Sequence, residues 1–332
     1  MFTGTVLAMV GLVAITFFSR KQSAATERYS ENSPTARLGT ARKHQESRTN
    51  MPNNGETHNT TPTRFVEAGG TRFAYRRFGT PLGVPLVLVQ HFRGNLDNFD
   101  PGVTDRLAEG REVILFDNAG VGATTGEAKT TIAEMAADAA SFIDALGLAQ
   151  VDMFGFSMGG QVAQQIAVDR PGLIRKLVLV GTGPRGGEGM ASLTDYTIEL
   201  FTREYDPQEL MWLPIFFGES EEAQASGAAF LARVNERIDR DAPVGPKAAA
   251  AHLAAAGEWG APGSDISYLK QITQPALVVN GSNDVVIPTI NSYVLQQELP
   301  NARLLLFPDS NHGSQFQFPE VFVREVNDFL ND

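Results

Sequence analysis

The chain has 332 residues, of which 42% are hydrophobic, so it is long enough for one large or two smaller globular domains. Its formal net charge is -11 at pH 7, and no basic patch stands out in the hydrophobic part of the chain, which argues against nucleic acid as a partner. Because cysteine is absent, disulfides, thiolate nucleophiles and cysteine-bound zinc are excluded.

The first 63 residues differ in character from the rest. Residues 6–18 are apolar and precede Arg20 and Lys21, but this run is shorter than the ~20 residues of a membrane span and lacks the basic start of a secretory signal. We predict that residues 1–18 form a signal peptide or a marginal membrane anchor; the alternative is an uncleaved leader. Residues 19–63 are polar without an apolar period, which predicts a disordered linker.

Residues 64–332 read as one folded domain in which strands and helices alternate. A Gly69-Gly70 turn within residues 64–78 predicts a hairpin. The further predicted strands are Val84 to Gln90, Val113 to Phe116, the run from Val151, Lys176 to Val180, Gln274 to Asn280 and Arg303 to Phe307. The predicted helices are Asp100 to Glu109, a stretch behind the capping box at 131–134, Gln161 to Asp169, Thr289 to Glu298 and a last one containing Phe322 and Val326. This alternation predicts a parallel α/β sheet.

One stretch, residues 184–264, interrupts the alternation because it is long, rich in alanine and helix-prone. We predict a helical cap inserted over the carboxyl ends of the strands, where sheets of this kind bind ligands. The alternative is a helical extension packed on one edge. Apolar cap residues predict a pocket for an acyl or aromatic group, or else pack the core of the cap itself; they are Met190, Leu193, Tyr196, Leu210, Trp212 and Phe216.

The strand that begins at Val151 runs into Gly155-Phe156-Ser157-Met158-Gly159, which fits the pattern Gly-x-Ser-x-Gly. Small residues on both sides of Ser157 permit a sharp turn from strand into helix, which lifts the hydroxyl above the sheet. At a helix N-terminus, free backbone amides and the positive end of the helix dipole favour a developing oxyanion. The pattern predicts a nucleophilic serine; the alternative is a Gly-Ser loop after a buried strand.

A serine nucleophile needs a base. Of the five histidines, His44 and His58 fall in the predicted linker, and His252 falls in an alanine-rich helical stretch where we expect a packing or surface role. The remaining two, His91 and His312, each follow a predicted strand. His312 and His91 are therefore rival candidates on the residues alone.

The base in turn needs an acid, and Asp284 follows the predicted strand that ends near Asn280. The carboxyl ends of parallel strands meet at one edge of the sheet, so Ser157, Asp284 and His312 are expected to lie together. Their chain order is the order of the triad in α/β-hydrolases. The sequence from about Arg64 to Asp332 thus resembles the α/β-hydrolase family.

Two further loops carry the resemblance. The run from Gln90 to Gly94 is similar to the family's oxyanion loop after the third strand, and Phe116 to Gly122 is similar to its Asp-x-x-Gly-x-Gly loop. The resemblance implies an α/β-hydrolase fold, with a mostly parallel central sheet, helices on both faces and an inserted helical cap. It also implies that the backbone N–H groups of Phe92 and Met158 form the oxyanion hole, and it makes His91 a structural residue of this loop.

This chain departs from the family pattern in the same loop. Phe92 stands where many members have glycine, and Arg93 is a candidate for binding a substrate carboxylate, with a solvated loop arginine as the alternative. We take His91, Arg93 and Trp212 as candidate substrate contacts. A serine at position 157 disfavours the epoxide hydrolases and haloalkane dehalogenases, which use an aspartate nucleophile.

The expected function is that of a serine hydrolase that cleaves a carboxylic ester or lactone, without a metal or cofactor. The alternatives are a cofactor-free haloperoxidase or perhydrolase, a carbon–carbon bond hydrolase, and a catalytically silent receptor for a small molecule. The expected partner is a small substrate with an apolar acyl or aromatic group. The oligomeric state is left open, and the localisation depends on residues 6–18: membrane-anchored or secreted if they act as an anchor or signal, and otherwise cytoplasmic.

Overall fold

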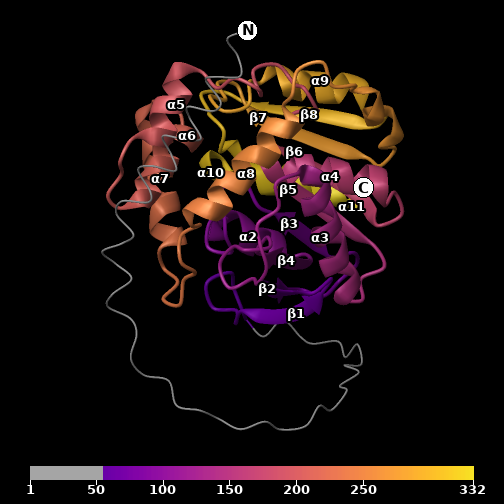
Figure 1. The fold of residues 1–332 in the computed structure, drawn as a ribbon. Coiled ribbons are helices and arrows are strands. Elements are labelled where there is room, and N and C mark those ends of the chain that lie inside the picture. Colours follow the sequence, from indigo (N-terminus) through magenta and orange to yellow (C-terminus); the bar gives the residue numbers. More distant parts are fainter. Residues whose placement is uncertain (1–54) are drawn as a thin grey trace.

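The structure is a computed structural model that describes residues 55–332 of the chain. The strands are β1 (Arg64–Ala68), β2 (Thr71–Gly79), β3 (Leu86–Val89), β4 (Glu112–Phe116), β5 (Val151–Phe156), β6 (Ile174–Val180), β7 (Ala276–Gly281) and β8 (Ala302–Phe307). They form one sheet in the spatial order β1-β2-β4-β3-β5-β6-β7-β8 (Figure 1). The pairs β1–β2 and β2–β4 are antiparallel and all the others are parallel, as the alternating sequence pattern predicts.

Helices follow most of the strands. Those of the sheet domain are α2 (Pro101–Ala108), α3 (Ile132–Ala145), α4 (Met158–Asp169), α9 (Ile290–Glu298), α10 (Ser314–Gln317) and α11 (Pro319–Asn331), with a 3-10 turn η3 (Ser267–Gln271). Two of them begin at side-chain caps, because Asp100 accepts from the N–H of Gly102 and Thr131 from that of Glu134. Both starts agree with the sequence prediction.

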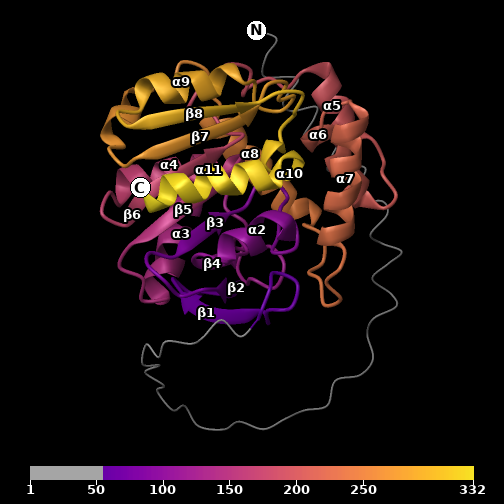
Figure 2. The ribbon, with the colours of Figure 1, turned by 180° about the vertical axis from the view of Figure 1, so that it is seen from behind.

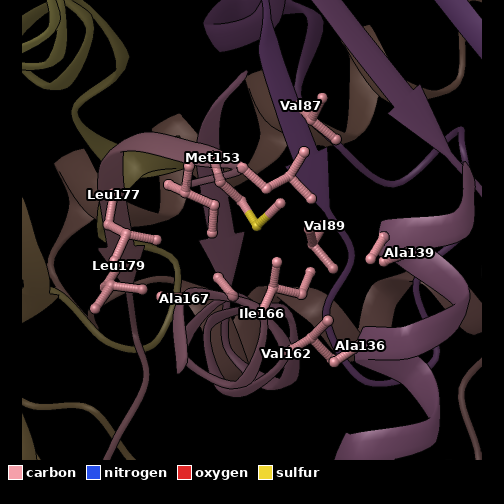
Figure 3. Close-up of a cluster of buried hydrophobic side chains, with 14 of the residues drawn as sticks. Val87, Val89, Ala136, Ala139, Met153, Val162, Ile166, Ala167, Leu177 and Leu179 are labelled. Atoms are coloured by element: carbon pink, nitrogen blue, oxygen red, sulfur yellow. The ribbon is translucent and has the colours of Figure 1, made fainter. Parts of the chain in front are cut away.

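Two hydrophobic layers hold these helices on opposite faces of the sheet. Alternate residues of a strand point to opposite faces, so Met153 of β5 faces α3 and α4 while Phe154 faces α2 and α11. Figure 3 shows the first layer, where Val87 and Val89 of β3 and Leu177 of β6 lie in one cluster with side chains of α4 such as Ile166. Figure 2 shows the opposite face, where α11 lies along the sheet beside α2. The central strands are therefore buried on both sides.

The insertion between β6 and β7 is helical, as predicted for a cap. Its elements are α5 (Asp195–Thr202), η2 (Gln208–Met211), α6 (Trp212–Phe216), α7 (Glu221–Val234) and α8 (Pro246–Trp259). In Figure 1, α5, α6 and α7 stand together at one side of the sheet. Side chains of α6 and α7 join the layer that contains α2 and α11, while Trp259 at the end of α8 joins the layer with α3 and α4. The cap thus packs against both layers.

The folded part begins earlier than Arg64, so the predicted linker end at residue 63 is wrong. His58 is buried, and its imidazole makes hydrogen bonds with the Thr104 hydroxyl at 2.9 Å and the Leu96 carbonyl at 3.0 Å. The Arg237 guanidinium of the cap segment donates to the carbonyls of Asn59 at 3.0 Å and Thr61 at 2.9 Å. The polar composition of this segment predicts disorder, but its polar groups form hydrogen bonds with residues that are distant in the sequence.

The other N-terminal predictions lie outside the described residues. These are the signal or anchor at 1–18 and residues 19–54 of the predicted linker. Over the range 55–332, none of the helices combines the length and the apolar character that a transmembrane span requires.

Candidate active site

Ser157 occupies the sharp turn between β5 and α4. Its backbone has φ 56° and ψ −119°, a conformation that non-glycine residues rarely adopt. A Cβ atom at Gly155 would lie 2.6 Å from the Cα of Gly160, and one at Gly159 would collide with the carbonyl oxygen of Val89. The glycines therefore allow α4 to start directly at the end of β5 and against β3, which leaves the serine hydroxyl at the edge of the sheet.

Ser157, His312 and Asp284 come together in the structure. Ser157 follows β5, Asp284 follows β7 and His312 follows β8, so each stands at the carboxyl end of a parallel strand. His312 Nε2 lies 2.8 Å from Ser157 Oγ, and His312 Nδ1 lies 2.8 Å from Asp284 Oδ2. All three side chains are buried, so bulk water does not separate them.

The acid fixes which nitrogen of His312 carries the proton. A carboxylate only accepts hydrogen bonds, so Nδ1 of His312 donates to Asp284 and Nε2 accepts from the Ser157 hydroxyl. The other carboxylate oxygen, Asp284 Oδ1, accepts from the N–H groups of Val286 at 2.8 Å and Ile287 at 2.9 Å. The arrangement is thus a continuous donor-to-acceptor chain from the serine to the acid.

The two predicted oxyanion donors lie at the same corner of the fold. Met158 is the first residue of α4, so its N–H has no acceptor within the helix. Gly159 packs against the carbonyls of Val89 and Gln90, which brings this first turn against the start of the loop that carries Phe92. Among the described residues, no backbone oxygen accepts from the N–H of Phe92.

The family follows from comparison with known proteins. A family model of the alpha/beta hydrolase fold matches residues 84–319, which is most of the chain. The chain belongs to the α/β-hydrolase fold family. The observed sheet, with its helices on both faces and its helical insertion, confirms the fold class predicted from the sequence.

Relatives of this α/β-hydrolase are named for different activities. An alpha/beta hydrolase fold protein from Chitinophaga pinensis is 41% identical with a TM-score of 0.78, over 83% of this chain and 100% of that one. A pimeloyl-[acyl-carrier protein] methyl ester esterase of Nitrosomonas europaea is 34% identical over 177 residues, which are 51% of this chain and 67% of that protein. A putative non-heme bromoperoxidase of Mycobacterium tuberculosis is 28% identical over 263 residues, which are 75% of this chain and 93% of that protein.

In this α/β-hydrolase the rival histidine, His91, makes no hydrogen bond with Ser157. Its Nδ1 donates to the Phe92 carbonyl at 2.9 Å, and its ring packs edge-on against Phe156, Trp212 and Phe216. Burial lowers the pKa of His91 to about 3, so the imidazole is neutral. His91 therefore links the loop that carries Phe92 to the cap, and its Nε2, which has no hydrogen-bond partner within residues 55–332, is able to accept one.

Arg93 and Trp212, the other candidate substrate contacts of the hydrolase, line one cavity of about 170 Å³. Only 9% of the surface of Arg93 is exposed, so the alternative of a solvated loop arginine is wrong. Burial lowers the pKa of its guanidinium. Met211 and Val244 add apolar surface to the cavity, and the acidic residues Glu209 and Asp241 also line it. The His91 ring contacts both Trp212 in the cavity wall and Phe156, the residue before Ser157.

The fold places two further residues near the site: His252, for which the sequence predicts a packing or surface role, and Asn311, which no sequence pattern marks. His252 lies on α8 with its ring 6.4 Å from that of Phe92, and burial lowers its pKa to about 4. Neither of its ring nitrogens has a hydrogen-bond partner among the described residues. Asn311 precedes His312 and is buried against the cap. The burial of His252 agrees with a packing role, whereas only the packing of the cap on the strand ends reveals Asn311.

Proposed function

We propose that this α/β-hydrolase is a serine hydrolase that cleaves a carboxylic ester or lactone through an acyl-enzyme intermediate. The observation that carries the proposal is the hydrogen-bond chain from Ser157 Oγ through His312 to Asp284, with 2.8 Å at each step. A serine, an imidazole and a carboxylate in this geometry are the components of nucleophilic acyl transfer.

In the first half of the reaction, His312 Nε2 takes the Ser157 proton while Oγ attacks the substrate carbonyl carbon. Asp284 supports the positive charge that develops on the imidazole. The N–H groups of Phe92 and Met158 receive the oxyanion of the tetrahedral intermediate, where loss of one donor costs about 3 kcal/mol. The imidazolium then gives its proton to the departing alkoxide, so the alcohol leaves and the acyl group stays on Ser157.

In the second half, water replaces the alcohol. His312 Nε2 removes a proton from the water as it attacks the acyl carbonyl, and the same two N–H groups hold the second oxyanion. Collapse of this intermediate breaks the bond to Ser157 Oγ, and the serine regains its proton from His312. The products are a carboxylic acid and an alcohol, or a hydroxy acid from a lactone.

For the substrate, we take the cavity beside His91 to receive an apolar or aromatic group. Trp212, Met211 and Val244 supply apolar walls, and Arg93 supplies a cation for a carboxylate at the far end of an acyl chain. The relative from Nitrosomonas europaea is named for a methyl ester of an acyl group, which supports an ester substrate.

The relative named as a putative bromoperoxidase supports one alternative, in which peroxide replaces water as the acyl acceptor. The acylation step at Ser157 is the same in both reactions. Peroxide-dependent bromination without added metal, at rates above ester hydrolysis, would favour that alternative.

The direct test is the hydrolysis of p-nitrophenyl acetate and butyrate by the full chain and by Ser157→Ala. We expect the variant to lose at least about 10³-fold in kcat, since triad removal leaves only the contribution of binding and the oxyanion donors. Equal activity of the two proteins would overturn the proposed function.

A further inference from the structure

The loop that carries His312 is joined to the end of cap helix α6. The last carbonyl groups of a helix receive no hydrogen bond from N–H groups of the same helix, so they need donors from elsewhere. Here the N–H of His312 donates to the Ile215 carbonyl at 3.1 Å, and the N–H of Gly313 donates to that of Phe216 at 3.0 Å. The end of α6 is therefore capped by the backbone of the loop that carries the base.

The Asn311 side chain completes this cap. Its Nδ2 donates to the Pro214 carbonyl at 3.1 Å and to the Phe217 carbonyl at 2.8 Å, so one amide group spans the last turn of α6. The side chain is buried, and both bonds replace water that the carbonyls would otherwise bind. These four hydrogen bonds come from three consecutive residues, so they restrict the movement of the loop relative to α6.

Close packing holds the loop from both sides. A Cβ atom at Gly313 would collide with the Cβ of Phe216, and one at Gly281 would collide with the carbonyl oxygens of Ser310 and Asn311. The loop thus lies between the end of β7 and α6 with no room for larger residues. Because the loop backbone is held in place, the backbone of His312 has a fixed position relative to Ser157.

We propose that Asn311 is a positioning residue for His312, because its side-chain amide ties the loop of the base to the end of α6. The 2.8 Å bond between His312 and Ser157 then depends on a cap helix whose own residues lie outside the proton relay. A displacement of the loop by about 1 Å costs up to about 100-fold in rate when it separates reacting groups. The inference rests on the proposed function, since it assigns a supporting role to the same base.

The test compares Asn311→Ala with Asn311→Asp, which keeps the shape but replaces the NH₂ donor by a carboxylate. For each we measure kcat and KM with p-nitrophenyl butyrate, and the rate of Ser157 labelling by a fluorophosphonate from pH 5 to 9. We expect kcat and the labelling rate to fall by about 10- to 100-fold. KM should stay within about twofold, because substrate contacts are unchanged.

Asn291→Ala is the matched control. Asn291 is also a buried asparagine whose Nδ2 donates to two carbonyls, of Glu188 at 2.8 Å and Pro288 at 3.0 Å, but it belongs to α9. The control variant is expected to lose thermal stability like Asn311→Ala while its kcat stays within about twofold of the parent. If Asn311→Ala keeps its kcat and labelling rate as the control does, Asn311 is structural only and the inference is overturned.

Two outcomes separate the inference from the proposed function. If the parent chain is not labelled at Ser157, the proposed function fails, whereas equal labelling of the parent and Asn311→Ala overturns the inference alone. Should the alanine variant not fold, Asn311→Ser retains one shorter donor and is expected to show an intermediate loss. Full labelling and full kcat in the serine variant would then overturn the inference.

Discussion

The two oxygens of Asp284 have different partners, and this difference determines which nitrogen of His312 carries the proton. Oδ1 accepts from the N–H groups of Val286 and Ile287 in the turn after β7, so Oδ2 is the oxygen that faces His312. Since Oδ2 only accepts, the imidazole proton stays on Nδ1, and Nε2 accepts the hydrogen bond of the Ser157 hydroxyl. A local turn thereby selects the tautomer that the proposed mechanism requires.

Asp284→Asn should reverse that tautomer. The two amides of Val286 and Ile287 will hold the asparagine oxygen in the place of Oδ1, so its NH₂ will face His312 and favour a proton on Nε2. We expect kcat for p-nitrophenyl butyrate to fall by about 10³- to 10⁴-fold with little change in stability. Asp265→Asn, which changes an exposed aspartate that also accepts from a backbone N–H, is the control. A loss below tenfold in Asp284→Asn would contradict the assignment.

Arg93 should matter for anionic substrates only. In the cavity it shares with Trp212, a carboxylate of the substrate would gain a charge-assisted hydrogen bond of about 1.5–3 kcal/mol. Arg93→Met is therefore expected to raise KM by about 10- to 100-fold for a monoester of a dicarboxylic acid, and to leave KM for neutral butyrate esters nearly unchanged. Steady-state kinetics on the two substrates measure the difference; equal changes for both would remove Arg93 from substrate recognition.

At the scale of elements, the contact between α4 and β3 holds the site together. Gly159 in the first turn of α4 packs on the Val89 carbonyl, and any Cβ there meets rigid backbone. Gly159→Ala should therefore push α4 away from β3, with a loss of about 1–3 kcal/mol in the free energy of unfolding. The same shift moves Met158, so activity should fall as well. Urea unfolding and ester hydrolysis measure the two effects.

Gly172→Ala provides the comparison for this prediction. Gly172 lies in the turn after α4, nothing lies within 4 Å of a Cβ built on it, and its φ is not positive. Alanine there is expected to be neutral or slightly stabilising, because it restricts the unfolded chain. If Gly159→Ala behaves like Gly172→Ala, the close approach of α4 to β3 does not support the site.

At the scale of the whole molecule, three buried histidines make the fold sensitive to acid. Burial lowers the pKa of His58 and His91 to about 3 and that of His252 to about 4, from an ordinary value of 6.5. Between these values the unfolded chain binds protons that the folded chain does not. Stability is therefore fully present above pH 6.5 and falls as the pH drops toward about 4, by at most about 1.4 kcal/mol per pH unit for each histidine.

Unfolding by urea between pH 4.5 and 8 measures this slope. His252→Phe removes one of the three groups without leaving an unpaired partner, because neither nitrogen of His252 is hydrogen-bonded to a described residue. On acidification, the free energy of unfolding is expected to fall less steeply in the variant than in the parent. The two slopes should differ by at most about 1.4 kcal/mol per pH unit. Identical slopes for the parent and the variant would show that His252 is protonated as readily in the folded chain as in the unfolded one.

The sequence predicts the sheet domain well, because its cues are local. Apolar runs mark the strands, capping residues such as Asp100 and Thr131 mark helix starts, and Gly-x-Ser-x-Gly marks the turn at Ser157. Strand ends alone suffice to bring His312 and Asp284 to that turn, since parallel strands share an edge.

The residues that sequence patterns do not predict depend on distant packing. His58 lies in a polar stretch and becomes buried only through α2 and Arg237 of the cap segment. Asn311 bonds to carbonyls almost a hundred positions earlier in the chain, and no local pattern marks such a partner. Arg93 is buried because the cap covers it, which its own loop sequence does not reveal.

The roles proposed for His312, Asp284 and Asn311 all depend on covalent catalysis at Ser157. The most direct measurement is to mix the full chain with a p-nitrophenyl ester, stop the reaction in acid within its first turnover, and map the peptides by mass spectrometry. We predict an acyl group on the peptide that contains Ser157, formed in the parent and absent from Ser157→Ala and strongly reduced in His312→Ala. Turnover of the ester at full rate with no acyl group on that peptide would contradict the account.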